Sequence, residues 1–214
     1  MCNYAVNSIT FSSHSLLLLK GLHKKVLACY DAMAGGHNLV KDFMKAHGYP
    51  VPFGVNNTDH FSACDEFITN KKGVYYFQCE TTSAWDANME PFIKLLRERY
   101  FNKVQLSFCS EEQGNDVFLV KDDTGVFYPE RFKVDWCMGD DYETQYFNTF
   151  GELFGYLKEM FPKARLSYYD TLEGIKDSID LAYENKDEEY FFYVYRFRDY
   201  YNEYENYISI REAA

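Results

Sequence analysis

The sequence lacks the short motifs that identify most nucleotide-dependent and hydrolytic enzymes. None of the patterns G-x-x-x-x-G-K-[ST], G-x-G-x-x-G, G-x-S-x-G or H-E-x-x-H occurs among its 214 residues. These patterns build the phosphate-binding loop, the dinucleotide site, the nucleophile elbow and the zinc-protease helix, respectively. We therefore assign no catalytic residue, no cofactor and no metal from motifs, and we expect a protein that is not an enzyme.

Closely spaced metal ligands are also missing. The six Cys residues are scattered without a Cys-x-x-Cys pair, and the five His residues show no His-x-x-x-His spacing. Cys79 and Cys109 lie in strand-like runs, where a thiol packs as a small apolar side chain. Scattered cysteines of this kind are typical of a reduced, cytoplasmic protein.

Long hydrophobic runs are absent as well. The stretch "SLLLL" at residues 15–19 is too short for a signal-peptide core, and no basic region precedes it. A membrane-spanning helix needs about 20 apolar residues, and no run approaches that length. We expect neither a secretory signal nor a membrane span, which again favours the cytoplasm.

Positive charge is scarce in most of the chain, whose net charge is −11. Residues 1–60 carry five Lys and three Asp, whereas residues 61–214 carry 17 Lys or Arg against 30 Asp or Glu. Binding to a phosphate backbone or to an anionic membrane needs clustered Lys and Arg. The acidic chain therefore disfavours both partners, and it leaves a basic protein partner or mimicry of nucleic acid open.

Aromatic side chains are abundant, with 20 Tyr and 19 Phe. Such side chains fill cores and sheet faces, and they also populate protein-recognition surfaces. The run "EYFFYVYRF" from residue 189 predicts a strand with an aromatic core face of Phe191, Tyr193, Tyr195 and Phe197. The Tyr-rich acidic segment 199–207 that follows is equally consistent with a binding surface.

The first 85 residues predict strands around two helices. "NSITF" at residue 7 alternates like a strand, and a helical pattern then runs to the glycine pair at residues 35–36. A short helix is expected near residues 39–47, followed by a long loop. "DEFIT" and "VYYFQCETT" predict strands that are joined by a turn at "NKKG".

One passage occurs twice in the second half of the chain. "LRERYFNKVQLSFCSEEQG" begins at residue 96, and "YLKEMFPKARLSYYDTLEG" begins sixty residues later. Each combines a helical apolar stripe with an alternating run, "KVQLSFC" or "KARLSYY", and strand-like runs stand on both sides. Thr149 and Glu152 form a capping box before the second helix. The sequence thus predicts two related β-α-β-β units within domains of residues 1–125 and 126–214, the second packed on the first.

Two passages resemble a known family. "MCNYAVNSITFSS" fits a start pattern M-x-N-(W/Y)-x-x-N-x-(L/I)-x-(I/V/F)-(S/T), and "FQCETTSAWDANMEPFIKLLRERYFNKVQLSFCSEEQG" is similar to a strand, T-A-W, proline, helix, strand and acidic-glycine turn. Both are typical of the YubB ferredoxin-like family of plasmid and phage proteins. The chain departs from that family at "SACDEFITNKKGVYYF", where members carry a W-G-T-K-W-like segment. The resemblance implies a ferredoxin-like α+β fold with helices on one face of an antiparallel sheet, and an origin on mobile DNA.

Two tryptophans stand at corresponding places before the helices of the repeated passages. Trp85 and Trp136 are interpreted as core anchors between sheet and helix. The alternative is that Trp85 and its neighbour Asp86 rim a binding cleft at the strand–helix junction.

The leading hypothesis is a non-enzymatic, cytoplasmic binding or accessory protein of a mobile element, which recognises a protein partner through aromatic and acidic residues. The candidate surface consists of Trp85, Asp86, Tyr200, Tyr201, Tyr204 and Tyr207. One alternative is an acidic inhibitor that mimics DNA or blocks a host defence protein. Another is an N-terminal-nucleophile hydrolase, because Cys2 would become the terminal residue if Met1 were removed.

Overall fold

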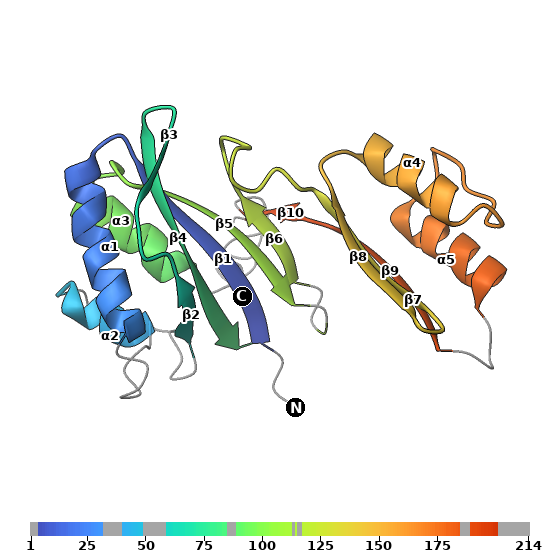
Figure 1. Ribbon diagram of the computed structural model, residues 1–214, viewed down its shortest axis with the longest axis horizontal. Helices are drawn as coiled ribbons and strands as arrows, with labels where there is room; N and C mark the ends of the chain where they lie inside the picture. Colours follow the sequence, from blue (N-terminus) through green and yellow to red (C-terminus); the bar gives the residue numbers. More distant parts are fainter. Residues whose placement is uncertain are drawn as a thin grey trace, which may run out of the picture. The chain divides into compact units, whose positions relative to one another are not determined.

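The chain folds into two compact units (Figure 1). The computed structural model describes residues 4–31, 40–48, 59–84, 89–112, 114, 117–184 and 189–200. Unit 1 comprises Met1–Tyr128 with Asp199–Ala214, and unit 2 comprises Pro129–Arg198. The sequence placed the division at residue 125, and the described residues Asp199 and Tyr200 group with unit 1.

Unit 1 is built on a seven-stranded sheet. Along the sheet the order is β10 (Arg198–Asp199), β6 (Val117–Lys121), β5 (Gln105–Glu112), β1 (Tyr4–Ser13), β4 (Val74–Ala84) and β2 (His60–Cys64), and β3 (Thr69–Lys71) also pairs with β4. The pairs from β6 to β2 and the β3–β4 pair are antiparallel. The predicted α+β class is therefore confirmed.

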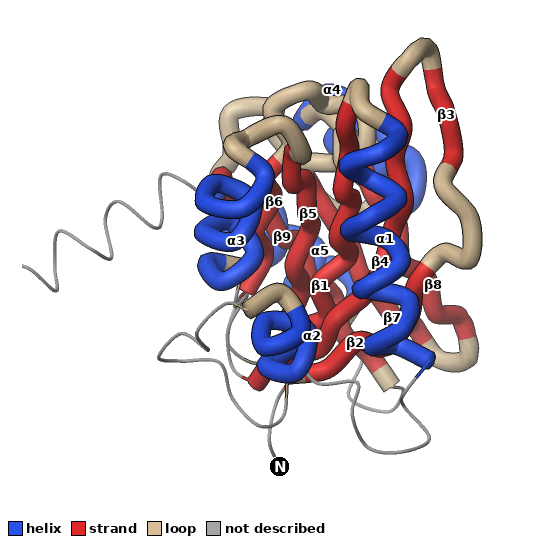
Figure 2. The backbone as a smooth tube through the Cα atoms, turned by 90° about the vertical axis from the view of Figure 1, so that its left-hand side faces the viewer, coloured by secondary structure: helices blue, strands red, loops and turns tan. Residues whose placement is uncertain are grey.

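The three helices that the structure describes in unit 1 cover one face of this sheet (Figure 2). They are α1 (Leu16–Asp31), α2 (Val40–Ala46) and α3 (Glu90–Tyr100). Alternation along β1 turns Ile9 and Phe11 toward the helices, where they are fully buried with Phe77 and Phe92. Because β4, α3, β5 and β6 follow one another in the chain, the first predicted β-α-β-β unit is confirmed.

Unit 2 is a three-stranded antiparallel sheet with two helices. The sheet order is β8 (Asp141–Phe147), β7 (Phe132–Met138) and β9 (Tyr190–Arg196), and α4 (Phe150–Met160) and α5 (Leu172–Tyr183) lie between β8 and β9 in the chain. The predicted capping box is confirmed, since Glu152 N–H donates to Thr149 Oγ1 and Glu152 Oε2 accepts from Thr149 N–H. Trp136 is buried, as expected of a core anchor, and its Nε1–H donates to Tyr156 Oη.

The second predicted β-α-β-β unit is wrong. The described residues 163–169 contain no strand, and Tyr168 and Tyr169 are 53% and 95% exposed. Ser167 and Asp170 instead form a turn, and Thr171 Oγ1 accepts from Gly174 N–H to begin α5. Polar side chains that bond to nearby backbone favour such turns and caps over a strand. Unit 2 is therefore β-β-α-α-β, and the repeated passage is a repeat of pattern only.

The predicted core face of β9 is also wrong, although the strand itself is present. Phe192 is buried with β7 and the helices, and Val194 packs against the same cluster. The alternate residues Phe191, Tyr193 and Tyr195 therefore lie on the opposite face. Both faces of this strand are apolar or aromatic, so alternation alone does not decide which one is covered.

Candidate functional site

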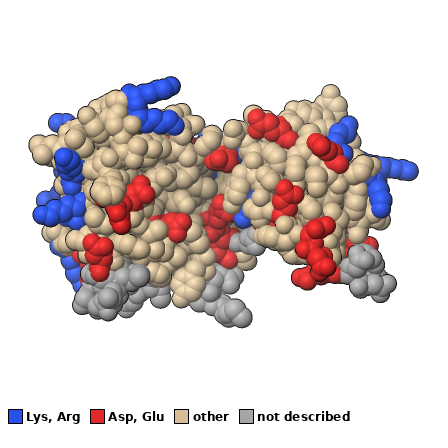
Figure 3. All heavy atoms as spheres, viewed as in Figure 1, with Lys and Arg blue, Asp and Glu red and all other residues tan. Residues whose placement is uncertain are grey.

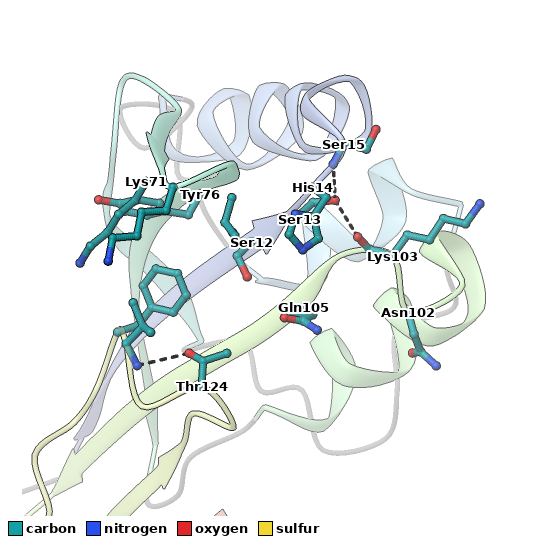
Figure 4. Close-up of a pocket in the computed structure, with 14 residues that line it drawn as sticks. Ser12, Ser13, His14, Ser15, Lys71, Tyr76, Asn102, Lys103, Gln105 and Thr124 are labelled. Atoms are coloured by element: carbon teal, nitrogen blue, oxygen red, sulfur yellow. Dashed lines mark hydrogen bonds between the residues drawn. The ribbon is translucent and has the colours of Figure 1, made fainter.

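A pocket of about 980 Å³ opens at one end of the unit 1 sheet (Figure 4). Its floor is a row across three strands, because Ser12 of β1 lies opposite both Tyr76 of β4 and Gln105 of β5. Residues directly opposite in an antiparallel pair point to the same side. Ser12 alternates with Phe11, so this floor lies on the face of the sheet away from the helices.

The β3–β4 turn forms one rim of the pocket. Lys71 pairs with Val74, so Lys72 and Gly73 make a two-residue turn, with φ of 54° and 83°. Two positive φ values are typical of a type I′ turn, which fits the twist of a hairpin. The turn was predicted from "NKKG", and it places two exposed lysines beside each other at the rim.

The junction between β1 and α1 forms another side of the pocket. Ser13 Oγ donates to the Lys103 carbonyl at 2.6 Å and accepts from Ser15 N–H at 3.1 Å. His14 Nδ1 lies 3.3 Å from the Gly73 carbonyl. Figure 4 shows Ser13 linking this junction to the α3–β5 loop, with the Lys103 side chain extending away from Ser12. The amino end of α1 therefore faces the pocket, where the helix dipole favours negative charge.

The β6–β7 loop closes the site and is organised by one carboxylate. Asp122 accepts from the backbone N–H groups of Thr124, Phe127 and Tyr128, and from the Thr124 hydroxyl. Burial alone would raise the pKa of Asp122, but these hydrogen bonds outweigh it and lower the pKa below its ordinary value. The loop holds the Phe127 ring 5.2 Å from that of Tyr76.

The charge of the pocket is opposite to that of the chain. Among its described lining residues, Lys71 and Lys72 carry their charges at the rim and none is Asp or Glu, whereas the whole chain has a net charge of −11. Val74, Val126 and the Tyr76–Phe127 pair supply an apolar wall. The arrangement can hold a molecule that has both a flat apolar part and an anionic group.

The residues predicted from the sequence as a binding surface do not form this site. Tyr200 is buried, and its ring packs 5.0 Å from that of Phe108, so it does not present its ring to solvent. The other candidates lie outside the described residues: Cys2, Trp85, Asp86, Tyr201, Tyr204 and Tyr207.

Sequence reasoning missed the pocket because four separate segments build it. The adjacent lysines of "NKKG" were the available sequence signal for this site. They line a pocket because Ser12–Ser15, Asn102–Gln105 and Thr124–Phe127 lie nearby in the folded chain. Among the residues that the structure describes, no group of three or more His, Cys, Asp or Glu is placed to hold a metal ion. Within the same residues, no helix is long and apolar enough to cross a membrane.

No family model matches the chain, and neither a curated protein nor a solved structure is significantly similar to it.

Proposed function

We propose that this protein is a non-enzymatic binding protein that holds a small anionic molecule with a flat apolar part in the unit 1 pocket. The observation that carries the proposal is the lining: Lys71 and Lys72 stand at the rim, and none of the described lining residues carries a carboxylate. The Tyr76–Phe127 pair offers a surface for the flat part of the ligand.

The distribution of charge over the molecule supports a local anion site. On the face shown in Figure 3, acidic side chains lie in separate groups over both units. Basic side chains gather at the end of unit 1 where Figure 1 places the β3–β4 turn. This pattern favours a local site for an anion over a continuous acidic face that mimics nucleic acid.

The polar groups of the pocket are suited to binding. Ser13 Oγ is engaged with the Lys103 carbonyl, and His14 Nδ1 faces the Gly73 carbonyl. An activated serine instead needs a base at its hydroxyl and a group that orients the base. The lining residues supply hydroxyls, amides and ammonium groups at the sides of an open cavity, and those groups recognise a ligand without reacting with it.

The proposal extends to the origin and fold of unit 1. The order β5-β1-β4-β2, with α1 after β1 and α3 between β4 and β5, supports a ferredoxin-like arrangement. The resemblance of residues 1–125 to the YubB family supports an accessory role for a cytoplasmic protein of a plasmid or phage.

The test is an NMR titration of the ¹⁵N-labelled protein with three probes: 1-naphthyl phosphate, 1-naphthol and inorganic phosphate. We expect saturable shifts at the backbone amides of Ser12, Gly73 and Gln105 with 1-naphthyl phosphate, and weaker effects from the two partial probes. The double variant Lys71→Gln/Lys72→Gln should weaken binding of the phosphate ester severalfold. The matched control Lys24→Gln/Lys25→Gln, on the exposed side of α1, should not. Equal loss in both variants, or shifts confined to unit 2, would refute the proposed site.

A further inference from the structure

The unit 2 sheet has a second face on the side away from α4 and α5. Figure 1 shows both helices of this unit on one side of β7, β8 and β9. On the other side, Cys137 of β7 lies between Tyr142 of β8 and Phe191 of β9, and the next pair along β9 brings Tyr193 beside Asp135. The two outer strands therefore carry aromatic rings, and the central strand carries smaller or charged side chains.

The rings form a continuous aromatic row, defined here as Tyr142, Phe191, Tyr193 and Tyr195. Tyr142 and Phe191 meet edge to face at 6.0 Å, Phe191 and Tyr193 lie 5.6 Å apart, and Tyr193 and Tyr195 stack at 6.0 Å. Tyr142 is 64% exposed and Tyr193 is 43% exposed, whereas Cys137 beneath them is 6% exposed. Large aromatic side chains held in this way are characteristic of recognition surfaces.

A polar network that is exposed at Tyr142 and buried at Asp135 and Lys133 holds one end of the row. The Tyr142 and Thr144 hydroxyls lie 2.9 Å apart, and Thr144 Oγ1 donates to Asp135 Oδ1 at 2.7 Å. Asp135 also pairs with Lys133 at 3.2 Å, and both side chains are almost fully buried. Each of the two charges therefore has an opposite partner inside the sheet. The row is pre-organised, which reduces the entropy lost when a partner binds.

Carboxylates border the Tyr142 end of the row. The β7–β8 turn contributes Asp140, and Asp141 begins β8. Glu189 precedes β9 and accepts from Gly139 N–H through its carbonyl. Burial and these three nearby carboxylates raise the pKa of the Cys137 thiol. Unit 2 as a whole carries nine Lys or Arg against fifteen Asp or Glu within residues 129–198. The exposed rings are therefore next to negative charge.

The row already attracts one cation from its own chain. Lys176 of α5 pairs with Asp180 and places its Nζ 5.8 Å from the centroid of the Tyr193 ring. A cation near the face of an aromatic ring is attracted by the ring quadrupole. The Tyr142–Phe191 end combines the same ring chemistry with carboxylates.

We propose that the aromatic row docks a basic protein segment, whose arginine side chains stack on Tyr142 and Phe191 and pair with the carboxylates at the β7–β8 turn. Arginine fits better than lysine because its planar guanidinium stacks on rings and bonds to a carboxylate through two N–H groups. This surface lies in unit 2 and is separate from the unit 1 pocket. The combination of aromatic and acidic recognition expected from the sequence is thereby placed on β8 and β9.

The test measures fluorescence anisotropy of labelled peptides with the full-length protein at near-physiological salt. The probes are three peptides of equal length with alternating Gly-Arg, Gly-Lys or Gly-Gln. We expect the Arg peptide to bind severalfold tighter than the Lys peptide, and the Gln peptide not to bind. Tyr142→Thr should weaken binding of the Arg peptide by roughly two- to fivefold, which is the usual range for an exposed cation–π contact. The double variant Asp140→Asn/Asp141→Asn should weaken binding of the same peptide more than Tyr142→Thr does.

Two matched variants separate this site from general attraction to an acidic chain. Tyr169→Thr removes an aromatic side chain that is even more exposed and lies outside the row. Glu173→Gln/Asp177→Asn removes two exposed charges from α5. Both should bind the Arg peptide like the unaltered protein.

Three results would overturn the proposal. The first is equal affinity for the Arg and Lys peptides, and the second is an equal loss in the control variants. The third is a concentration-dependent dimer in sedimentation velocity that Tyr142→Thr abolishes, because a second copy would then be the occupant. Thermal melting of each variant checks that it folds, and all the substituted residues are exposed.

Discussion

Unit 1 and unit 2 share one packing arrangement and differ in the side chains on the sheet face that the helices do not cover. In each, helices bury one side of an antiparallel sheet, through Phe11, Phe77 and Phe92 in unit 1 and through Trp136 and Phe161 in unit 2. The opposite face of unit 1 carries Ser12, Gln105 and the lysine-rimmed pocket, whereas that of unit 2 carries an aromatic row. Burial in the core therefore restricts the side chains on one face of a sheet, and the other face remains available for binding.

The largest expected effect tests whether the two units are energetically separate. Phe161 is fully buried and meets Trp136, Tyr183 and Phe192 within 6 Å. Phe161→Ala should destabilise unit 2 by about 3–5 kcal/mol through lost burial and a cavity. Hydrogen exchange followed by mass spectrometry should show faster exchange in β7 and β9 and unchanged exchange in β1 and β4. Equal acceleration in both units would instead indicate a single cooperative unit.

The next effect concerns the loop that closes the unit 1 pocket. Asp122→Ala leaves the N–H groups of Phe127 and Tyr128 without their acceptor, and should cost about 1–3 kcal/mol. The matched control Asp123→Ala removes an exposed carboxylate that pairs with Lys121, and should cost well under about 1 kcal/mol. Chemical denaturation measures both. Similar losses in the two variants would contradict the structural role given to Asp122.

The same carboxylate predicts a pH dependence. Because the folded state lowers the pKa of Asp122, its contribution to stability is present above the unfolded-state pKa of about 3.9 and is lost as the pH falls through the folded-state value. Thermal melts between neutral and acidic pH should therefore converge for the unaltered protein and Asp122→Asn at low pH. A constant difference down to the lowest pH would refute this assignment.

A smaller effect distinguishes the two helices of the repeated passage. The Thr149 side chain caps α4, whereas Met89 at the start of α3 provides no side-chain cap. Thr149→Ala should cost about 1 kcal/mol, and Thr149→Ser, which keeps the hydroxyl, should cost much less. Urea denaturation of unit 2 measures the difference. Equal stability of the two variants would show that the capping box contributes nothing here.

The smallest effect separates turn stability from ligand binding. Lys72 has φ of 54°, a conformation that Asn adopts more readily, so Lys72→Asn should stabilise the hairpin by up to about 1 kcal/mol. The same change removes one rim ammonium group and should weaken binding of 1-naphthyl phosphate. Lys71→Asn, at a residue of the β3 strand, should weaken binding without raising the melting temperature. A higher melting temperature in both variants would contradict the turn assignment.

Much of the fold follows from local pattern. The strand β1, the helix α1, the turn at Lys72-Gly73 and the α4 capping box were all predicted, because periodicity and turn chemistry act over a few residues. The strand predicted over residues 163–169 failed because its alternation competes with Ser167, Asp170 and Thr171, whose side chains bond to the backbone. The stripe Leu172, Ile175 and Ile179 of α5 was overlooked beside it.

The candidate site was far less predictable. Its lysines come from one turn, its hydroxyls from the start of α1 and its aromatic wall from Tyr76 and Phe127, which stand about fifty residues apart in the chain. A surface site gives no periodic pattern in the sequence, because many kinds of side chain can occupy an exposed position. The ring of Tyr200, which the sequence placed on an exposed surface, is buried because it packs against Phe108.

Local sequence pattern was enough to predict the α+β class, the first β-α-β-β unit, the acidic charge and the strand β9 with rings on alternate sides. The packing of unit 2 determines that Phe192 is covered and that Phe191 and Tyr193 lie on the opposite face. The tertiary structure also brings Lys71 and Lys72 beside a pocket that three other segments line. Burial and the proximity of charges depend on which segments come together. The local sequence pattern does not indicate contacts between residues that are distant in the chain.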